Sequence, residues 1–394
     1  MSGGGTRIGS QRRVLGELIA KLRPRWRSDA NLPARIERLV GGDRRFGSRD
    51  RRLYRELIFA ALRYLPWVEP LLDSGPDRAL QRIAWLAAET PATKAFRAEL
   101  CAGLPPCPER VADKAAILGA EADALLPEWL RAECPEAFGA GQREALLSRP
   151  PLWVRMQSAD REAVLAEFAA RGWPSRTDRL LPNAAALPPD ADVSSTEAYR
   201  RGRVEIQDIG SQLVLESVGV EAGGRWLDAC AGAGGKTLQL AVLLGKDGSV
   251  EAHDIRSSVL EQLDLRARRA GLAGRITVVA RPDDGYDGVL VDAPCSGSGT
   301  WRRSPHLKWV TTRAAVLQAA RRQSGLLAEN AARVRPGGML VYATCSLCRS
   351  ENEGVVDAFS KVNREFDIAA PGLRLWPAAH NGDGFYVAAL RRLS

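Results

Sequence analysis

The chain has 394 residues, of which 45% are hydrophobic and 26% are charged, and its formal net charge is +9. This composition is ordinary for a soluble globular protein of two or three domains. No uninterrupted apolar run approaches the ~18 residues that a membrane span needs, and the N-terminus lacks the apolar segment of a signal peptide, so we expect a cytoplasmic protein with no membrane partner.

The N-terminal third is basic and helical in pattern. Residues 1–66 hold sixteen basic and six acidic side chains, mostly arginine on the basic side. Apolar residues recur at helical spacing within 14–22 and again within 53–65. We predict that residues 1–140 form an all-helical domain, disordered over 1–10. Its arginines are typical of a surface that binds phosphate backbones; a well-solvated helical surface is the alternative.

A shorter stretch with a mixed pattern follows. Residues 152–156 are predicted to form a strand and 159–171 a helix, and the proline-rich residues 187–192 a loop. We predict that residues 141–205 form a small α/β connecting subdomain.

The rest of the chain alternates between strand and helix patterns. The predicted strands are 225–229, 249–254, 275–280, 287–292, 338–343, 365–369 and 384–390. The predicted helices are 208–219, 235–244, 257–271, 312–334 and 350–361. Such alternation predicts an α/β domain over 206–394 with a doubly wound sheet, whose ligands bind at the carboxyl ends of the strands.

The first of these strands leads into a glycine-rich turn, Asp-Ala-Cys-Ala-Gly-Ala-Gly-Gly-Lys-Thr, over 228–237. A phosphate-binding loop needs a glycine where Cys230 stands, and a dinucleotide fingerprint needs one where Thr237 stands. Asp254 ends the next strand, where an acid can accept hydrogen bonds from ribose hydroxyls; capping of the following helix is its alternative role. The pattern indicates a nucleoside cofactor without a pyrophosphate, and S-adenosylmethionine fits.

Two further motifs end in a cysteine just after a predicted strand. They are Asp-Ala-Pro-Cys-Ser-Gly-Ser-Gly over 292–299 and Tyr-Ala-Thr-Cys-Ser over 342–346. A thiolate that adds to C6 of cytosine makes C5 nucleophilic enough to take a methyl group. One cysteine can form this adduct while the other assists its breakdown, and Asp292 can hold the pyrimidine.

A reactive thiol needs cationic neighbours or a helix N-terminus to ionise. We expect this help from a helix that begins near residue 350, from the cofactor's sulfonium, or from basic side chains. The candidate side chains are Lys236, Arg302, Arg303 and Lys308.

Cysteine and histidine usage gives no sign of a metal. The seven cysteines are irregularly spaced, the single Cys-x-x-Cys runs from Cys345 to Cys348, and the chain has three histidines. Structural zinc needs about four grouped ligands, so we expect no metal and no disulfide framework.

The three motifs resemble those of the RsmB/Sun family of RNA cytosine-5 methyltransferases, over about 206–394. The turn at 228–237 and the two cysteine motifs carry the likeness, together with Glu-Asn-Glu at 351–353. Residues 49–63 are similar, more weakly, to the NusB-like RNA-binding domain of the bacterial 16S ribosomal RNA enzyme. The resemblance implies a Rossmann-like class I methyltransferase sheet with an all-helical NusB-like N-terminal domain.

The resemblance also implies roles for single residues. Cys345 would be the nucleophile, Cys295 would assist product release, and Asp292 would contact the cytosine and border the cofactor. Lys236 would lie near the reacting atoms, and Asp254 would bind the ribose. The methionine end of S-adenosylmethionine would be wrapped by Cys230, Ala231, Gly232, Ala233, Gly234, Gly235 and Lys236.

Some positions depart from the family pattern. Residues 231–234 read Ala-Gly-Ala-Gly where Ala-Ala-Pro-Gly is usual, and Met156-Gln157 replaces Val-Asn. Arg281 stands where an acid usually touches the adenine, with Asp283 as a substitute.

The sequence therefore predicts a monomeric enzyme that forms 5-methylcytosine in RNA, with 16S ribosomal RNA as the first candidate. Two alternatives remain open. One is the same chemistry on transfer RNA, and the other is a non-catalytic RNA-binding factor in ribosome assembly.

Overall fold

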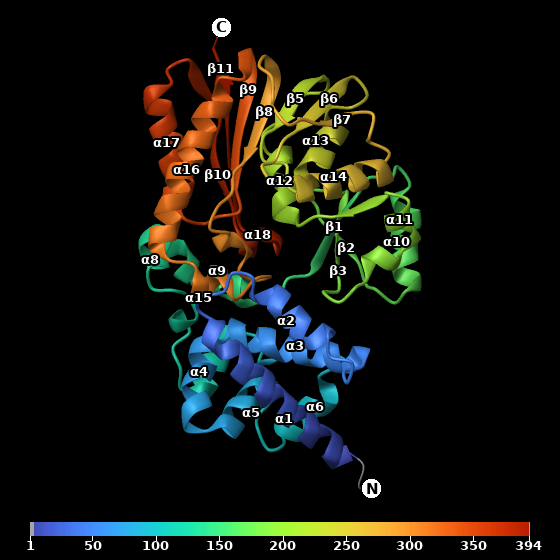
Figure 1. The fold of residues 1–394 in the computed structure, drawn as a ribbon, viewed down its shortest axis with the longest axis vertical. Coiled ribbons are helices and arrows are strands. Elements are labelled where there is room, and N and C mark those ends of the chain that lie inside the picture. The colour runs from blue at the N-terminus through green and yellow to red at the C-terminus, as the bar shows by residue number, and fades with distance from the viewer. Residues whose placement is uncertain (1–3, 394) are drawn as a thin grey trace. The chain divides into compact units, whose positions relative to one another are not determined.

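The computed structural model describes residues 4–393, with side chains from Arg7 onward, and divides the chain into two compact units (Figure 1). The helical unit contains the described residues up to Arg131, Glu136–Leu147 and Trp301–Thr312. The α/β unit contains Ala132–Pro135, Ser148–Thr300 and the described residues from Arg313 onward. Each unit therefore includes a short segment that is distant in sequence from the rest of it.

The helical unit is built from amphipathic helices. Its longest helices are α1, α3 and α5, and Leu15 of α1, Leu57 of α3 and Ile83 of α5 are fully buried at their helical spacing. The bounds are α1 Gly4–Leu22, η1 Arg23–Arg25, α2 Leu32–Gly41, α3 Ser48–Arg63, α4 Leu65–Ser74, α5 Pro76–Leu86, α6 Lys94–Leu100, α7 Val111–Leu118, η2 Asp123–Leu125, α9 Ala140–Leu147 and α15 Leu307–Val310. The chain crosses between the units within α8, Leu130–Glu133, and η3, Pro135–Phe138.

Residues 301–312 are held in the helical unit by polar contacts to main-chain carbonyls. Lys308 is buried, and its Nζ donates to the carbonyls of Arg63 and Leu125 at 3.0 and 3.1 Å. Trp309 Nε1 donates to the Leu62 carbonyl at 2.7 Å. The sequence pattern gave no sign that this segment leaves the α/β unit.

A small antiparallel sheet opens the α/β unit, in the order β2-β3-β1-β4. Its core lies against α10, where Val164 and Phe168 are buried with Val154 of β1. The bounds are β1 Leu152–Met156, α10 Arg161–Ala170, β2 Arg176–Thr177, β3 Ala184–Leu187, η4 Val193–Ser195, α11 Glu197–Arg200 and β4 Val204–Ile206. The strand and helix predicted here are present.

The main sheet has seven strands in the order β10-β11-β9-β8-β5-β6-β7. Strands β9, β8, β5, β6 and β7 are parallel, and β11 runs antiparallel between β9 and β10. The bounds are β5 Gly224–Asp228, β6 Gly248–Ala252, β7 Ile276–Val278, β8 Tyr286–Asp292, β9 Val334–Thr344, β10 Phe366–Leu375 and β11 Phe385–Arg392.

Helices cover both faces of this sheet (Figure 1). On one face, Leu290 and Val341 pack with Leu213 and Leu240 of the α12 and α13 side; on the other, Val291 packs with α16 and α17 residues. Successive residues of β8 thus point to opposite cores, as the period of two requires. The bounds are α12 Ile209–Glu216, α13 Gly235–Leu243, α14 Ser257–Arg269, η5 Ser298–Thr300, α16 Arg313–Ala331, η6 Arg349–Glu351, α17 Glu353–Val362 and α18 Pro377–His380.

The predicted fold class is confirmed, because the alternating patterns form a Rossmann-like sheet beside a helical N-terminal region. The division at 140 and 205 and the NusB-like character stay predictions. The expected disorder of residues 1–10 is wrong for residues 4–10, because α1 begins at Gly4, and residues 1–3 lie outside the described part. Among residues 4–393, no helix is long and apolar enough to cross a membrane.

Candidate active site

The loops that carry the predicted site residues leave one edge of the main sheet. β5 ends at Asp228, β8 at Asp292 and β9 at Thr344, and the three strands are parallel neighbours. The winding direction of the sheet reverses at β5, since β6 lies on one side of it and β8 on the other. Open α/β sheets bind ligands at such a point. This edge is therefore the candidate active site.

The glycine-rich loop between β5 and α13 is anchored at its start by Asp228. This carboxyl is buried and accepts hydrogen bonds from Thr237 Oγ1 at 2.7 Å and from the Cys230 amide at 3.3 Å. Gly234 has a φ of 85°, and a Cβ there would lie 2.7 Å from Leu263 Cγ. The loop thus needs glycine at this position, both for its left-handed backbone and for its approach to α14.

Burial is the main influence on the pKa values of the two titratable groups at the start of this loop, Asp228 and Cys230. Burial raises the pKa of Asp228 to about 7, although the Thr237 hydrogen bond opposes the shift. Burial, reinforced by the charges of nearby acids, also raises the pKa of Cys230 far above its ordinary value. Cys230 is consequently a neutral thiol, and we assign it no nucleophilic role.

Asp254 follows β6 and lies against the glycine loop. Its carboxylate accepts from the Gly232 amide at 3.0 Å and from the Arg256 main chain and guanidinium at 2.9 to 3.0 Å. Burial raises its pKa, but the hydrogen bonds from Arg256 and Gly232 outweigh this and hold the pKa below the ordinary value. An ionised acid beside a glycine turn fits the ribose of S-adenosylmethionine.

The adenine end of that cofactor has no acid in the usual place. Asp283 is exposed and forms an ion pair with Arg225 at 2.9 Å, and Arg225 also binds Glu251 of β6. Asp283, which the sequence offered in place of the usual acid, is therefore engaged by Arg225 in an ion pair at the surface.

Lys236 and Asp292 form an ion pair at the centre of the edge. Lys236 lies in the first turn of α13 with 7% of its side chain exposed, and its Nζ donates to Asp292 Oδ2 at 2.9 Å. The ring of Phe385 lies 4.7 Å from the same ammonium group. Asp292 is 29% exposed, so its carboxylate is fixed by Lys236 yet accessible to a ligand.

The side chains of the two predicted cysteines are in contact. Cys295 lies on the loop after β8 and Cys345 on the loop after β9, and their sulfur atoms are 3.4 Å apart. The contact with Cys345 raises the pKa of Cys295 well above its ordinary value, and burial and the Glu351 charge add to the shift. The raised pKa keeps Cys295 protonated, so its thiol is available to donate to the Cys345 sulfur.

The buried side chains of Glu351 and Asn352 hold the Cys345 loop in place by hydrogen bonds, a role that strand and helix patterns do not predict. Asn352 Oδ1 accepts from Thr344 Oγ1 at 2.6 Å, and its Nδ2 donates to the Ser346 carbonyl at 3.0 Å. Glu351 binds the residues after both cysteines. In the sequence, only the family motif at 351–353 pointed to these residues, and it did not indicate which groups they would contact.

Three of the basic side chains proposed to help the thiols, Arg302, Arg303 and Lys308, belong to the helical unit. The Lys308 ammonium is enclosed by carbonyls of the helical unit, and burial lowers its pKa well below the ordinary value. Arg302 is fully buried in the same unit, and Arg303 is exposed on it. Lys236 is the candidate cation that lies at the sheet edge.

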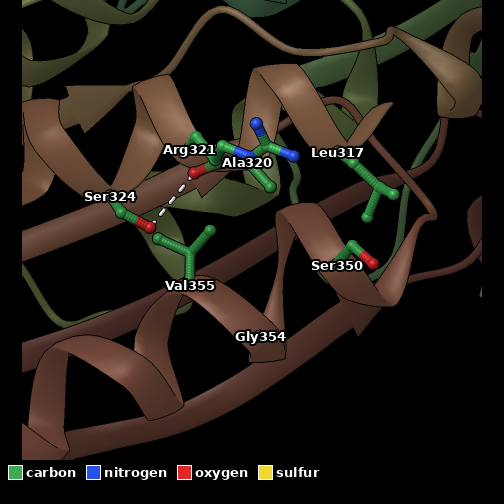
Figure 2. Close-up of a pocket in the computed structure, with 7 residues that line it drawn as sticks. All are labelled: Leu317, Ala320, Arg321, Ser324, Ser350, Gly354 and Val355. Atoms are coloured by element: carbon green, nitrogen blue, oxygen red, sulfur yellow. Dashed lines mark hydrogen bonds between the residues drawn. The ribbon is translucent and has the colours of Figure 1, made fainter. Parts of the chain in front are cut away.

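A cavity of about 330 Å³ lies elsewhere in the α/β unit, between α16 and α17 (Figure 2). It is lined by Leu317, Ala320, Arg321, Ser324, Ser350, Gly354 and Val355. None of these is a predicted site residue, and Ser324 Oγ is bonded to the Ala320 carbonyl. In the described part of the chain, no three His, Cys, Asp or Glu residues are grouped as metal ligands would be.

Comparison with known proteins gives related sequences over much of the chain. Residues 215–391 match the model of the family described as 16S rRNA methyltransferase RsmB/F. Ribosomal RNA small subunit methyltransferase B of Enterobacter sp. (strain 638) is 32% identical over 284 residues, which cover 68% of this chain and 66% of that protein. The protein of the same description from Cronobacter sakazakii is 31% identical over 290 residues, which cover 69% and 67%. The matches thus span about two thirds of each relative.

A solved structure is similar over almost the whole chain. The crystal structure of PH0851 covers 97% of this chain and 98% of its own, with a TM-score of 0.74 and 20% sequence identity. At this identity the likeness concerns the fold.

Proposed function

Because the chain belongs to the RsmB/F family of 16S rRNA methyltransferases, we propose that it methylates C5 of a cytosine in 16S ribosomal RNA. Membership of a methyltransferase family confirms the predicted cofactor, S-adenosylmethionine. When bound, this cofactor supplies an electrophilic methyl group. The observation that carries the proposal is the 3.4 Å sulfur pair at the carboxyl edge of the sheet, where Lys236 and Asp292 are also paired.

Cys345 begins the reaction as the nucleophile. Its thiolate forms a bond to C6 of the cytosine, and the electron pair of the C5–C6 double bond becomes available at C5. The two sulfurs lie 3.4 Å apart, and we assign Cys295 as the donor that stabilises the Cys345 thiolate before the attack. After the C5–methyl bond has formed, loss of the C5 proton restores the double bond and expels Cys345 as a thiolate.

Cys295 changes its state between these steps. The contact with the Cys345 sulfur is the main reason for its raised pKa. Once that sulfur is bonded to C6 it is a neutral thioether and this cause disappears, whereas burial and the charge of Glu351 still raise the pKa. Cys295 is thus more readily ionised in the adduct than before it, and we assign to its thiolate the removal of the C5 proton.

Asp292 and Lys236 hold the base. The exposed part of the Asp292 carboxylate can accept a hydrogen bond from the exocyclic amine of cytosine. The ion pair with Lys236 fixes the orientation of that carboxylate. Uracil carries no amine at this position, so the same pair favours cytosine.

The proposal is tested with radiolabelled S-adenosylmethionine and three samples: 16S ribosomal RNA, transfer RNA and RNA-free buffer. We expect label in the 16S RNA, located at 5-methylcytosine by nuclease digestion and mass spectrometry. The variant C345A should lose methyl transfer, because no thiol remains to activate C5. The variant C295A should accumulate a covalent RNA adduct that survives a denaturing gel, because breakdown lacks its base.

The controls separate the alternatives. Label in transfer RNA alone would assign the same chemistry to a different substrate. Binding of 16S RNA without label in any sample would leave a non-catalytic RNA-binding protein. The double variant C295A/C345A should form no adduct, and an adduct in that variant would contradict the assigned nucleophile.

A further inference from the structure

Glu351 is a buried carboxylate at the junction of the two cysteine loops. Its side chain has no exposed surface, although it ends η6 only six residues after Cys345. Oε1 accepts from the Ser296 amide at 2.7 Å and from Gln323 Nε2 at 3.0 Å. Oε2 accepts from the hydroxyls of Ser296 and Ser346. Four donors thus converge on one carboxylate.

These donors come from both loops that carry a reactive sulfur. Ser296 directly follows Cys295, and Ser346 directly follows Cys345. Gln323 of α16 also donates to the carbonyl of Pro294, the residue before Cys295, at 3.0 Å. Glu351 therefore connects the main chain beside one sulfur to the side chain beside the other.

The carboxyl group of Glu351 is buried among neutral hydrogen-bond donors. Within residues 4–393, Glu351 forms no ion pair, and its four donors are neutral. Burial of an unpaired carboxylate is unfavourable and is offset here only by charge-assisted hydrogen bonds. An apolar side chain would leave these four donors without an acceptor, and an amide offers one acceptor oxygen in place of two. The four donors therefore fix the carboxyl group of Glu351 between the two loops.

We propose that Glu351 is the positioning residue that holds the Cys295 and Cys345 sulfurs in contact for methyl transfer. It does not touch the reacting atoms and acts through Ser296 and Ser346. The inference rests on the proposed function for the meaning of the contact, but the contact itself can be measured without RNA or cofactor.

The test measures how fast the two sulfurs can be joined. Diamide oxidises two thiols to a disulfide and is itself reduced to the hydrazine, so its reaction with Cys295 and Cys345 reports their approach. The yield is followed by mass spectrometry of alkylated peptides from the full chain. We expect E351Q to slow this disulfide about tenfold or more, because displacement of reacting atoms by about 1 Å has effects of that size.

The control is E353Q, the same substitution two residues further along. Glu353 is 29% exposed and is paired with Arg374, away from both serines. E353Q should keep the wild-type disulfide rate. An unchanged rate in E351Q, or an equal loss in E351Q and E353Q, would overturn the proposal.

Two further measurements guard against simple misfolding. S346A removes one hydroxyl link and leaves the Ser296 and Gln323 donors in place, so it should slow the disulfide as well; an unchanged rate would count against the proposal. In methylation assays E351Q should lower kcat about 10- to 100-fold and leave the affinity for S-adenosylmethionine unchanged. A matching loss of cofactor affinity would indicate a structural role alone. If the wild type forms no 5-methylcytosine, the proposed function fails while the disulfide rates still decide the role of Glu351.

Discussion

Three carboxylates lie along one sheet edge, and their surroundings give them different chemistry. Asp228 is fully enclosed, with a pKa raised to about 7 by burial. Asp254 is ionised more easily than usual, because hydrogen bonds from Arg256 and Gly232 outweigh its burial. Asp292 is partly exposed and paired with Lys236. One residue type thus anchors a loop at Asp228 and, in the function we propose, accepts from a ribose at Asp254 and orients a base at Asp292.

The buried Asp228 makes stability depend on pH. An aspartate ionises near pH 3.9 in the unfolded chain, whereas in the folded chain its pKa is about 7. Between these values the folded state binds more protons, so this group stabilises the fold at low pH and the benefit is lost as pH rises towards 7. Asparagine does not titrate, and it can keep both hydrogen bonds, to Thr237 and to Cys230.

We therefore expect D228N to gain stability relative to the wild type by roughly 2 to 3 kcal/mol between pH 5 and pH 8. The measurement is urea unfolding of both proteins across this range without cofactor. Any difference in the free energy of unfolding that is the same at every pH reports effects of the substitution other than titration, and so serves as the internal control. Parallel stability curves for the two proteins would contradict the assignment.

The sequence identifies which residues reach the edge better than it identifies what binds them. Asp228, Asp292 and Cys345 follow strand patterns, and the carboxyl ends of parallel strands share an edge, so their proximity can be predicted. The contacts of Glu351 with Ser296 and Ser346 join positions 55 and 5 residues apart. No local pattern encodes such packing, so only the family motif pointed to this residue.

At the scale of elements, α14 links the small sheet to the glycine loop. Glu205 of β4 is buried and accepts from Arg266 at 2.9 Å and from Arg269 at 2.5 Å. Arg266 Nη1 also donates to the carbonyl of Ala233 in the loop at 2.7 Å. The position of the glycine-rich loop therefore depends on Arg266, which lies near the C-terminal end of α14.

We expect R266M to destabilise the α/β unit by about 1 to 3 kcal/mol, since Glu205 loses one of its two cationic partners in a buried site. The Ala233 carbonyl also loses its donor, so S-adenosylmethionine should bind about tenfold more weakly, the equivalent of about 1.4 kcal/mol. Calorimetry of unfolding and cofactor titration measure the two effects. The matched control is R268M, because Arg268 is 70% exposed and, among the residues that the structure describes, its one ion pair is with Asp264 on the same helix. Equal losses in R266M and R268M would refute the link.

The strands of the main sheet could be predicted because apolar runs such as β8 alternate regularly with helix patterns, and this alternation marks even the three-residue β7. Strands β2, β3 and β4 of the small sheet were not predicted: β2 and β4 have two and three residues, and β3 reads Ala-Ala-Ala-Leu, which has low strand propensity. Helix α2 was also missed; its ten residues hold only three buried side chains. The membership of residues 301–312 in the helical unit depends on the buried Lys308, which looks like a surface residue in the sequence.

Across the whole molecule, positive charge is concentrated in one part of the chain. Residues 1–66 hold sixteen basic and six acidic residues, whereas the whole chain has a net charge of +9. Several arginines of this region are used in ion pairs, such as Arg23 with Asp73. Arg38 of α2, Arg44 of the following turn and Arg52 of α3 are exposed and form no ion pair with other described residues. These three are available to bind phosphates.

We propose that the surface formed by Arg38, Arg44 and Arg52 contacts the RNA backbone. This contact should make the affinity for RNA depend on the salt concentration. Each phosphate contact contributes a slope of about −0.7 to −0.9 to a plot of log affinity against log salt. The variant R38Q/R44Q/R52Q should therefore reduce the slope by about 2 to 3. The control R268Q/R335Q/R364Q removes the same charge from exposed arginines of the α/β unit. Arg268 lies in the last turn of α14, Arg335 at the start of β9 and Arg364 just before β10, all at the sheet edge opposite the candidate site. The slope of this control should therefore stay near that of the wild type. Equal slopes for the two triple variants would show that net charge, rather than the surface formed by Arg38, Arg44 and Arg52, governs RNA binding.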